Sequence, residues 1–204
     1  MPQVVVLDYG SGNVRSAVRA LERAGATVQL SADPAAAVAA EGLVVPGVGA
    51  FAAVMAGLTA VSAAQILQQR AELGRPTLGI CVGMQVLFSE GIEHGVRTPG
   101  LAAWPGVVER LSAPVVPHMG WNTVLAPPGS ALFHGVADAR FYFVHSYGVP
   151  AAPLPNALVT TAEHGAEFIA AVETPLLSAT QFHPEKSGDA GARLLRNWLD
   201  GLPA

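Results

Sequence analysis

Short apolar runs alternate along the chain with segments in which apolar residues recur at helical spacing. Residues 3–8 form a β-branched run, which is typical of a strand buried on both faces. Apolar positions then recur over 14–21, and Gly25 supplies a helix stop. The same alternation predicts further strands at 26–30, 43–45 and 77–80, and helices within 50–73 and 83–90.

The second half of the chain reads as strands with shorter connections. These runs lie around 106–110, 141–147, 157–162, 168–172 and 177–182, and a last helix carries Leu194, Leu195, Trp198 and Leu199 on one face. Alternating βαβ units predict an α/β fold with a mainly parallel central sheet, helices on both faces and some antiparallel edge strands. No repeat or long linker divides the chain, so we expect one domain, residues 1–204, with functional residues at the carboxyl ends of the parallel strands.

The composition of the chain excludes several classes of protein. The 204 residues carry a net charge of −4, without the basic stripe of a nucleic-acid binder. A single cysteine excludes a disulfide framework and favours a reducing, cytosolic location. The mean hydropathy of +0.41 is high, but the longest uncharged run, between Glu41 and Arg70, is broken by proline, glycine and glutamine. We therefore expect no membrane span, and the N-terminus lacks the basic region of a signal peptide.

The segment 79–83, Gly-Ile-Cys-Val-Gly, follows a predicted strand and precedes a predicted helix. It matches the nucleophile-elbow pattern with Cys81 in place of serine. The tight turn requires small residues on either side, lifts the sulfur above the sheet and places it at a helix N-terminus, which favours a thiolate. The N–H of Val82 would face an oxyanion. A buried structural cysteine in a βα turn is the alternative that this motif alone leaves open.

The segment Gln-Phe-His-Pro-Glu, residues 181–185, strengthens the catalytic interpretation. His183 and Glu185 are two positions apart, so an extended segment held by Pro184 would direct both to one side. A carboxylate beside an imidazole fixes its tautomer. Each residue alone could be an ordinary surface residue, but with Cys81 they supply nucleophile, base and orienting group.

Glycines also follow the strand at 43–45, in the segment Pro-Gly-Val-Gly, residues 46–49. Glycines at a strand end allow backbone N–H groups to face a cleft. We expect Val48 or Gly49 to supply the second donor of an oxyanion hole, although an ordinary tight turn would have the same sequence.

Two further features of the sequence could indicate a cofactor or a metal, but neither has the required pattern. The Gly-Ser-Gly segment at 10–12 lacks the third glycine of a dinucleotide loop, because Arg15 stands in its place. Four histidines lack the spacing of metal ligands, and we interpret them as structural: His118, His134, His145 and His164. We therefore expect no metal and no organic cofactor.

These motifs together resemble those of the class I, or triad, glutamine amidotransferases, and more narrowly the glutaminase subunits of imidazole glycerol phosphate synthase. The matching segments are 7–13, 46–51, 78–85, 117–122, 142–147 and 181–188, which span nearly the whole chain. The resemblance implies the three-layer class I glutaminase fold. It also implies hydrolysis of glutamine to glutamate through a cysteine thioester, with the ammonia passing through a channel to a (β/α)₈ cyclase partner. That partner makes imidazole glycerol phosphate and an aminoimidazole carboxamide ribonucleotide.

The resemblance also assigns residues to substrate and partner. Those matched to the glutamine site are Gln85, Glu93, Ser146 and Tyr147, and those matched to the partner-facing side are Asn13, Trp121, Tyr142 and Lys186. Gln85 lies one helical turn after Cys81 and can face the same cleft, whereas we expect Glu93 in a loop. Lys186 is the only lysine of the chain. Trp121 could equally belong to the core.

Two alternatives remain at this stage. Another triad glutaminase, serving pyridoxal-phosphate or anthranilate synthesis, would share the elbow, but the segment at 117–122 disfavours it. A catalytically silent binding subunit could share the fold, but the complete set of Cys81, His183 and Glu185 disfavours that.

Overall fold

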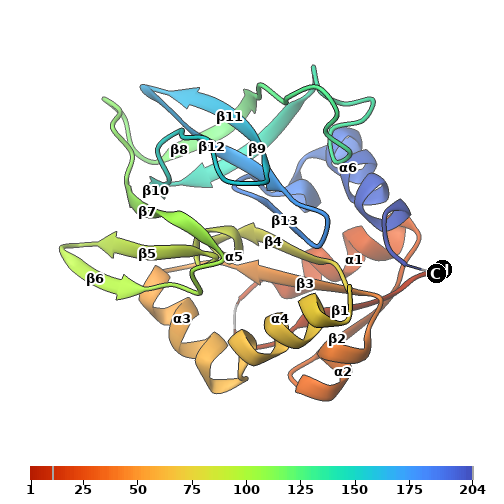
Figure 1. The fold of residues 1–204 in the computed structure, drawn as a ribbon. Coiled ribbons are helices and arrows are strands. Elements are labelled where there is room, and N and C mark those ends of the chain that lie inside the picture. The colour runs from red at the N-terminus through yellow and green to blue at the C-terminus, as the bar shows by residue number, and fades with distance from the viewer. Residues whose placement is uncertain (11, 204) are drawn as a thin grey trace.

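A seven-stranded sheet forms the centre of the computed structural model, which describes residues 1–10 and 12–203 (Figure 1). The strand order is β11-β12-β13-β4-β3-β1-β2. Five strands run parallel, and β11 and β12 are antiparallel at one edge. The strands are β1 (Gln3–Leu7), β2 (Thr27–Ser31), β3 (Gly42–Gly47), β4 (Thr77–Cys81), β11 (Leu158–His164), β12 (Ala166–Glu173) and β13 (Leu177–Thr180).

Helices cover both faces of this sheet, which confirms the predicted fold class (Figure 1). On one face α1 (Val14–Ala24) packs against α6 (Gly188–Asp200), and the other face carries α2 (Pro34–Ala39), α3 (Phe51–Ala60) and α4 (Ala63–Glu72). The predicted apolar face of the last helix is buried. Helix α2 was not predicted; it starts at an N-cap, Asp33, whose side chain accepts a 3.0 Å hydrogen bond from the N–H of Ala35.

Two smaller sheets lie beside the central one. One has the order β10-β7-β5-β6 and the other pairs β8 with β9. Their strands are β5 (Phe88–Glu93), β6 (Val96–Pro99), β7 (Trp104–Arg110), β8 (His118–Thr123), β9 (Arg140–His145) and β10 (Tyr147–Gly148). The prediction of helix over 83–90 was wrong in its second half. Helix α5 covers only Val82–Gln85, because the buried Phe88 begins a strand that pairs with both β6 and β7.

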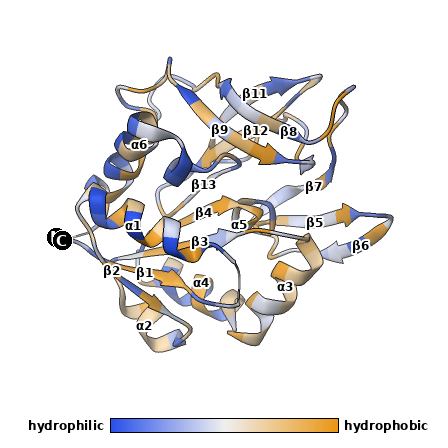
Figure 2. Cartoon of the chain, turned by 180° about the vertical axis from the view of Figure 1, so that it is seen from behind, coloured by the Kyte–Doolittle hydropathy of each residue, from blue (hydrophilic) through white to orange (hydrophobic). Residues whose placement is uncertain are grey.

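Apolar residues concentrate along the central strands, while polar residues lie on the outer sides of α1 and α6 (Figure 2). The strands β1, β3 and β4 are buried almost throughout. Within residues 1–10 and 12–203, no single helix has the length and apolarity to cross a membrane, although the bent pair α3–α4 meets the criteria of length and composition.

Candidate active site

Three adjacent parallel strands end at one place on the sheet. Gly47 of β3 lies opposite Cys81 of β4, and Ile80 lies opposite Thr180 of β13. A cavity of about 630 Å³ opens above these strand ends. Its lining includes Val48, Gly49, Cys81, Val82, Gln85, Glu93, Arg110, His145, Ser146, Tyr147, His183 and Lys186. The predicted chemistry-bearing residues from distant parts of the chain therefore meet around one space.

Cys81 occupies the sharp turn between β4 and α5. Its backbone angles, φ 57° and ψ −114°, are rare for a residue with a side chain, so the turn is strained. The glycines around it are required by close backbone contacts. A Cβ atom on Gly83 would lie 2.0 Å from the carbonyl oxygen of Val45, and one on Gly47 would lie 2.2 Å from the nitrogen of Gly83. The elbow geometry expected from the sequence is thus present.

The helix that follows Cys81 is shorter than expected. Helix α5 has four residues, so it adds little dipole beyond the N–H groups of its first turn. The argument that a helix N-terminus favours the thiolate is correspondingly weaker. Electrostatic stabilisation of the sulfur has to come mainly from neighbouring side chains.

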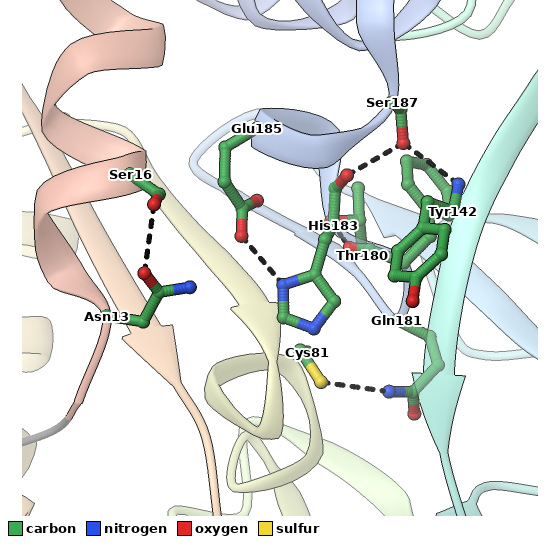
Figure 3. Close-up of polar contacts among 10 residues, drawn as sticks. Asn13, Ser16, Cys81, Tyr142, Thr180, Gln181, His183, Glu185 and Ser187 are labelled. Carbon is green, nitrogen blue, oxygen red and sulfur yellow. Dashed lines mark hydrogen bonds and ion pairs between the residues drawn. The ribbon is translucent and has the colours of Figure 1, made fainter. Parts of the chain in front are cut away.

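His183 and Glu185 form the principal ionic contact of the site (Figure 3). His183 Nδ1 lies 2.7 Å from Glu185 Oε1, and the two side chains are only 3% and 6% exposed. The extended geometry predicted for 183–185 was wrong, because Pro184–Lys186 forms a 3₁₀ turn. The turn still directs the carboxylate to the imidazole, and Figure 3 places the Cys81 sulfur beside the opposite edge of the ring.

The backbone of His183 is held from both sides. Its N–H donates to the carbonyl of Tyr142 over 3.0 Å, and its own carbonyl accepts from Ser187 Oγ at 2.7 Å. Ser187 Oγ also accepts from the N–H of Tyr142 at 3.0 Å (Figure 3). Ser187 belongs to the matched segment 181–188, but the sequence analysis assigned it no role of its own.

The surroundings of His183 favour its protonated form. Burial lowers the pKa of the imidazole, but hydrogen bonding and negative charge at Cys81 and Glu185 raise it more, to about 9. An imidazolium between a carboxylate and a thiol stabilises the thiolate, which is the nucleophilic form of cysteine.

Two buried glutamines are linked to each other, and one of them, Gln181, lies next to the sulfur. Gln85 donates from Nε2 to the carbonyl of Tyr147 at 2.8 Å and to Gln181 Oε1 at 3.0 Å. Gln181 Nε2 lies 3.7 Å from Cys81 Sγ. Gln85 therefore faces the cavity as expected. Gln181 was missed as a site residue, although it stands in the segment that pointed to His183.

The remaining residues matched to the substrate line the same cavity. Glu93 ends strand β5 and does not lie in a loop, because it pairs with Val96 of β6. One of its carboxylate oxygens accepts a 2.8 Å hydrogen bond from the N–H of Phe51, where α3 begins. Ser146 and Tyr147 lie where β9 passes into β10.

Of the residues matched to the partner-facing side, only Lys186 lines the cavity. Trp121 is 48% exposed, so it is not a core residue, and its ring meets that of Tyr142 edge-on at 6.1 Å. Lys186 is exposed and lines the cavity. Asn13, just before α1, is exposed and accepts a hydrogen bond from Ser16 Oγ at 2.9 Å (Figure 3).

Three of the four histidines interpreted as structural form one cluster. His118 Nδ1 lies 3.0 Å from His145 Nε2, and the ring of His164 stacks on His118 at 4.3 Å. Direct hydrogen bonding between the rings occupies the nitrogens that a metal would need. Among residues 1–10 and 12–203, no group of three or more histidine, cysteine, aspartate or glutamate side chains is arranged to hold a metal ion.

Comparison with known proteins connects this geometry to a family. Residues 5–202 match the family model "Glutamine amidotransferase class-I". The "Imidazole glycerol phosphate synthase subunit HisH" of Nocardia farcinica is 66% identical over 206 residues, covering 98% of each chain. The protein of the same name from Mycobacterium tuberculosis H37Rv is 63% identical over 201 residues, again covering 98% of each.

Solved structures share the fold at low sequence identity. A structure described as "Crystal structure of glutamine amidotransferase" superposes with a TM-score of 0.76 at 21% identity and covers 97% of both chains. The glutaminase domain of CTPS from Trypanosoma brucei has a TM-score of 0.66 at 16% identity, covering 98% of this chain and 94% of that one. With the sequence matches, these findings show that the chain belongs to the class I glutamine amidotransferase family, within the group of HisH proteins.

Proposed function

We propose that this chain is the glutaminase subunit of an imidazole glycerol phosphate synthase, acting in histidine biosynthesis. It hydrolyses glutamine to glutamate and passes the ammonia to a (β/α)₈ cyclase subunit. Residues 1–204 act as one glutaminase domain. The observation that carries the proposal is the meeting of Cys81 and His183 at the wall of an open cavity above the strand ends, with Glu185 bound to the imidazole of His183.

The three side chains fit the steps of amide hydrolysis. The Cys81 thiolate attacks the side-chain amide carbon of glutamine, and a tetrahedral oxyanion forms. His183 gives its proton to the leaving nitrogen, which departs as ammonia and leaves a glutamyl thioester. His183 then takes a proton from water, which attacks the thioester and releases glutamate. Glu185 keeps the imidazole oriented and stabilises its positive charge.

The cavity provides complementary groups for the substrate. Val82, Val48 and Gly49 line the cavity with Cys81, and the oxyanion is held by the backbone N–H of Val82 together with that of Val48 or Gly49. Gln85 has both amide hydrogens engaged, so its free oxygen can accept from a substrate N–H. Glu93 supplies negative charge for the ammonium of glutamine, with Ser146 and Tyr147 alongside.

The strand pair β8–β9 supplies an apolar surface for the partner. Trp121 pairs with Tyr142 and Met119 pairs with Val144, so these four side chains share one face of the ribbon. Met119 and Trp121 are among the exposed large apolar residues. Lys186 and Asn13 complete this surface, and a partner bound to it receives ammonia beside the triad. A reducing cytosolic location would keep Cys81 as a free thiol.

Reconstitution with a (β/α)₈ cyclase tests this function. Glutamate release should be much faster with both chains than with this chain alone, should rise further when the cyclase carries its ligand, and should be abolished in Cys81→Ser. We expect only weak turnover by the chain alone. The variant His183→Ala should lose the glutamine-dependent reaction and retain the cyclase reaction with added ammonia. Absence of glutamate release under every condition would favour a catalytically silent binding subunit.

A further inference from the structure

The sulfur of Cys81 faces a buried amide as well as an imidazole. Gln181 is fully buried just after β13, and Figure 3 shows its amide nitrogen directed at the sulfur, 3.7 Å away. We propose that Gln181 is a positioning residue whose amide N–H favours the thiolate form of Cys81. The direction of this amide is fixed by a hydrogen-bond chain that runs through Gln85 and the Tyr147 carbonyl and continues through two buried histidines.

The direction of every donor in this hydrogen-bond chain is set by a backbone carbonyl, because a carbonyl can only accept hydrogen bonds. The carbonyl of Tyr147 lies 2.8 Å from Gln85 Nε2, so the amide nitrogen of Gln85 must face it. The same nitrogen has a second hydrogen, which it donates to Gln181 Oε1 at 3.0 Å. With its oxygen engaged there, Gln181 turns its nitrogen to the sulfur. Reversing the Gln85 amide would place oxygen against the carbonyl oxygen, and reversing Gln181 would place N–H against N–H.

The Tyr147 carbonyl also accepts a hydrogen bond from His145, which in turn contacts His118. His145 Nδ1 lies 2.9 Å from that oxygen and must donate to it, so the neutral ring accepts at Nε2 from His118 Nδ1, 3.0 Å away. His118 Nε2 then accepts from Asn122 Nδ2 at 3.3 Å, and Asn122 donates its other hydrogen to the carbonyl of Glu163 at 2.9 Å. Burial is the main cause that lowers the pKa of His145 to about 3 and of His118 to about 4. Both rings are therefore neutral at pH 7, as this arrangement requires.

Other charges also face the sulfur and remain when Gln181 is changed. His183 stands beside it with Glu185 behind, and Lys186 lines the same cavity. A change at Gln181 therefore leaves these charges in place and removes the amide, both its N–H at the sulfur and its acceptor oxygen for Gln85 Nε2. The inference deepens the proposed function and rests on it for its catalytic meaning, but the reactivity of Cys81 can be measured without glutamine.

Alkylation of the full chain by iodoacetamide measures the effect directly, because Cys81 is the only cysteine. In Gln181→Met we expect alkylation at pH 7 to be about three- to tenfold slower, as for loss of one long hydrogen bond to a charged group. Loosened packing alone would open the cavity and speed the reaction. An unchanged or faster rate at pH 7 would overturn the proposal.

Separate variants test the part of the hydrogen-bond chain formed by His145 and His118. His145→Leu should slow alkylation in the same way, and His145→Asn, which retains a donor near the Nδ1 position, should recover at least part of the rate. His164→Phe keeps a ring stacked on His118 and should have no effect. An unchanged rate in His145→Leu would refute the contribution of the histidines to the orientation of Gln181. If Gln181→Met does not fold by circular dichroism, Gln181→Glu has the same shape without the donor, and it should also be slower.

The outcomes separate this inference from the proposed function. Slower alkylation in the Gln181 variant, together with no glutamate release from the wild-type complex, would sustain the positioning role and reject glutaminase activity. Normal glutamate release from the wild-type complex, together with unchanged alkylation in the Gln181 variant, would support glutaminase activity and reject the positioning role.

Discussion

Replacing Glu185 by glutamine should lower the pKa of His183. The rise of that pKa from 6.5 to about 9 corresponds to about 3.4 kcal/mol in favour of the imidazolium. A glutamine oxygen can still accept from Nδ1–H, but the bond then lacks a negative charge. Bonds to charged groups are worth about 1.5–3 kcal/mol and neutral ones about 1 kcal/mol. The variant should therefore lose about 1–2 kcal/mol, and the pKa should fall to about 8.

The titration can be followed by the NMR signal of the His183 ring, identified by its absence in His183→Ala. Because the folded state raises this pKa, the protonated ring stabilises the fold fully below pH 6.5, and the stabilisation disappears as pH rises through about 9. In Glu185→Gln the loss should occur at lower pH. Glu22→Gln, at an exposed position of α1, is the matched control and should leave the titration unchanged. A midpoint that stays near 9 in Glu185→Gln would show that the carboxylate does not support the charge.

Three further predictions concern the elbow, the histidine cluster and the partner surface. Gly83→Ala should lower the free energy of unfolding by at least about 3 kcal/mol in guanidinium titrations, since its Cβ would lie 2.0 Å from a β3 carbonyl. Gly201→Ala, where the nearest atom is 3.5 Å away, should be close to neutral, and equal effects of the two substitutions would contradict the elbow argument. Because burial lowers the pKa values of His118 and His145, their neutral forms contribute fully above pH 6.5 and the contribution is lost towards pH 4 and 3. The two histidines together should lose about 2.5 kcal/mol between pH 7 and pH 5.5, and the raised pKa of His183 offsets about 0.8 kcal/mol of this, so urea titrations should show about 1.5–2 kcal/mol less stability at pH 5.5, and a flat profile would refute this. Trp121→Ala should weaken cyclase binding in calorimetry by about 2 kcal/mol while changing unfolding little, and unchanged affinity would remove Trp121 from the interface.

The parallel core of the fold was predictable because its signals are local. Short β-branched runs followed by helical spacing identified β1, α1, β3 and β4 within a few residues. The glycines around Cys81 likewise marked the elbow, since each is required by a backbone contact inside the βα unit or with the adjacent strand β3.

The features that were missed depend on contacts distant in sequence. Apolar spacing over 83–90 indicated a helix, but pairing with β6 and β7 makes its second half a strand. Nothing near Gln181 reveals that its amide meets Gln85, 96 positions away. His118 and His145 are 27 residues apart and meet only because β8 and β9 pair in the register that places them opposite each other.

The bond between glutamine and Cys81 is the central claim, and intact-mass spectrometry of acid-quenched reactions tests it most directly. With the cyclase and its ligand present, the wild-type chain should carry a single glutamyl thioester, mapped by proteolysis to Cys81, and Cys81→Ser should carry none and release no glutamate. Glutamate release by Cys81→Ser, or a glutamyl group attached at another residue, would contradict the account.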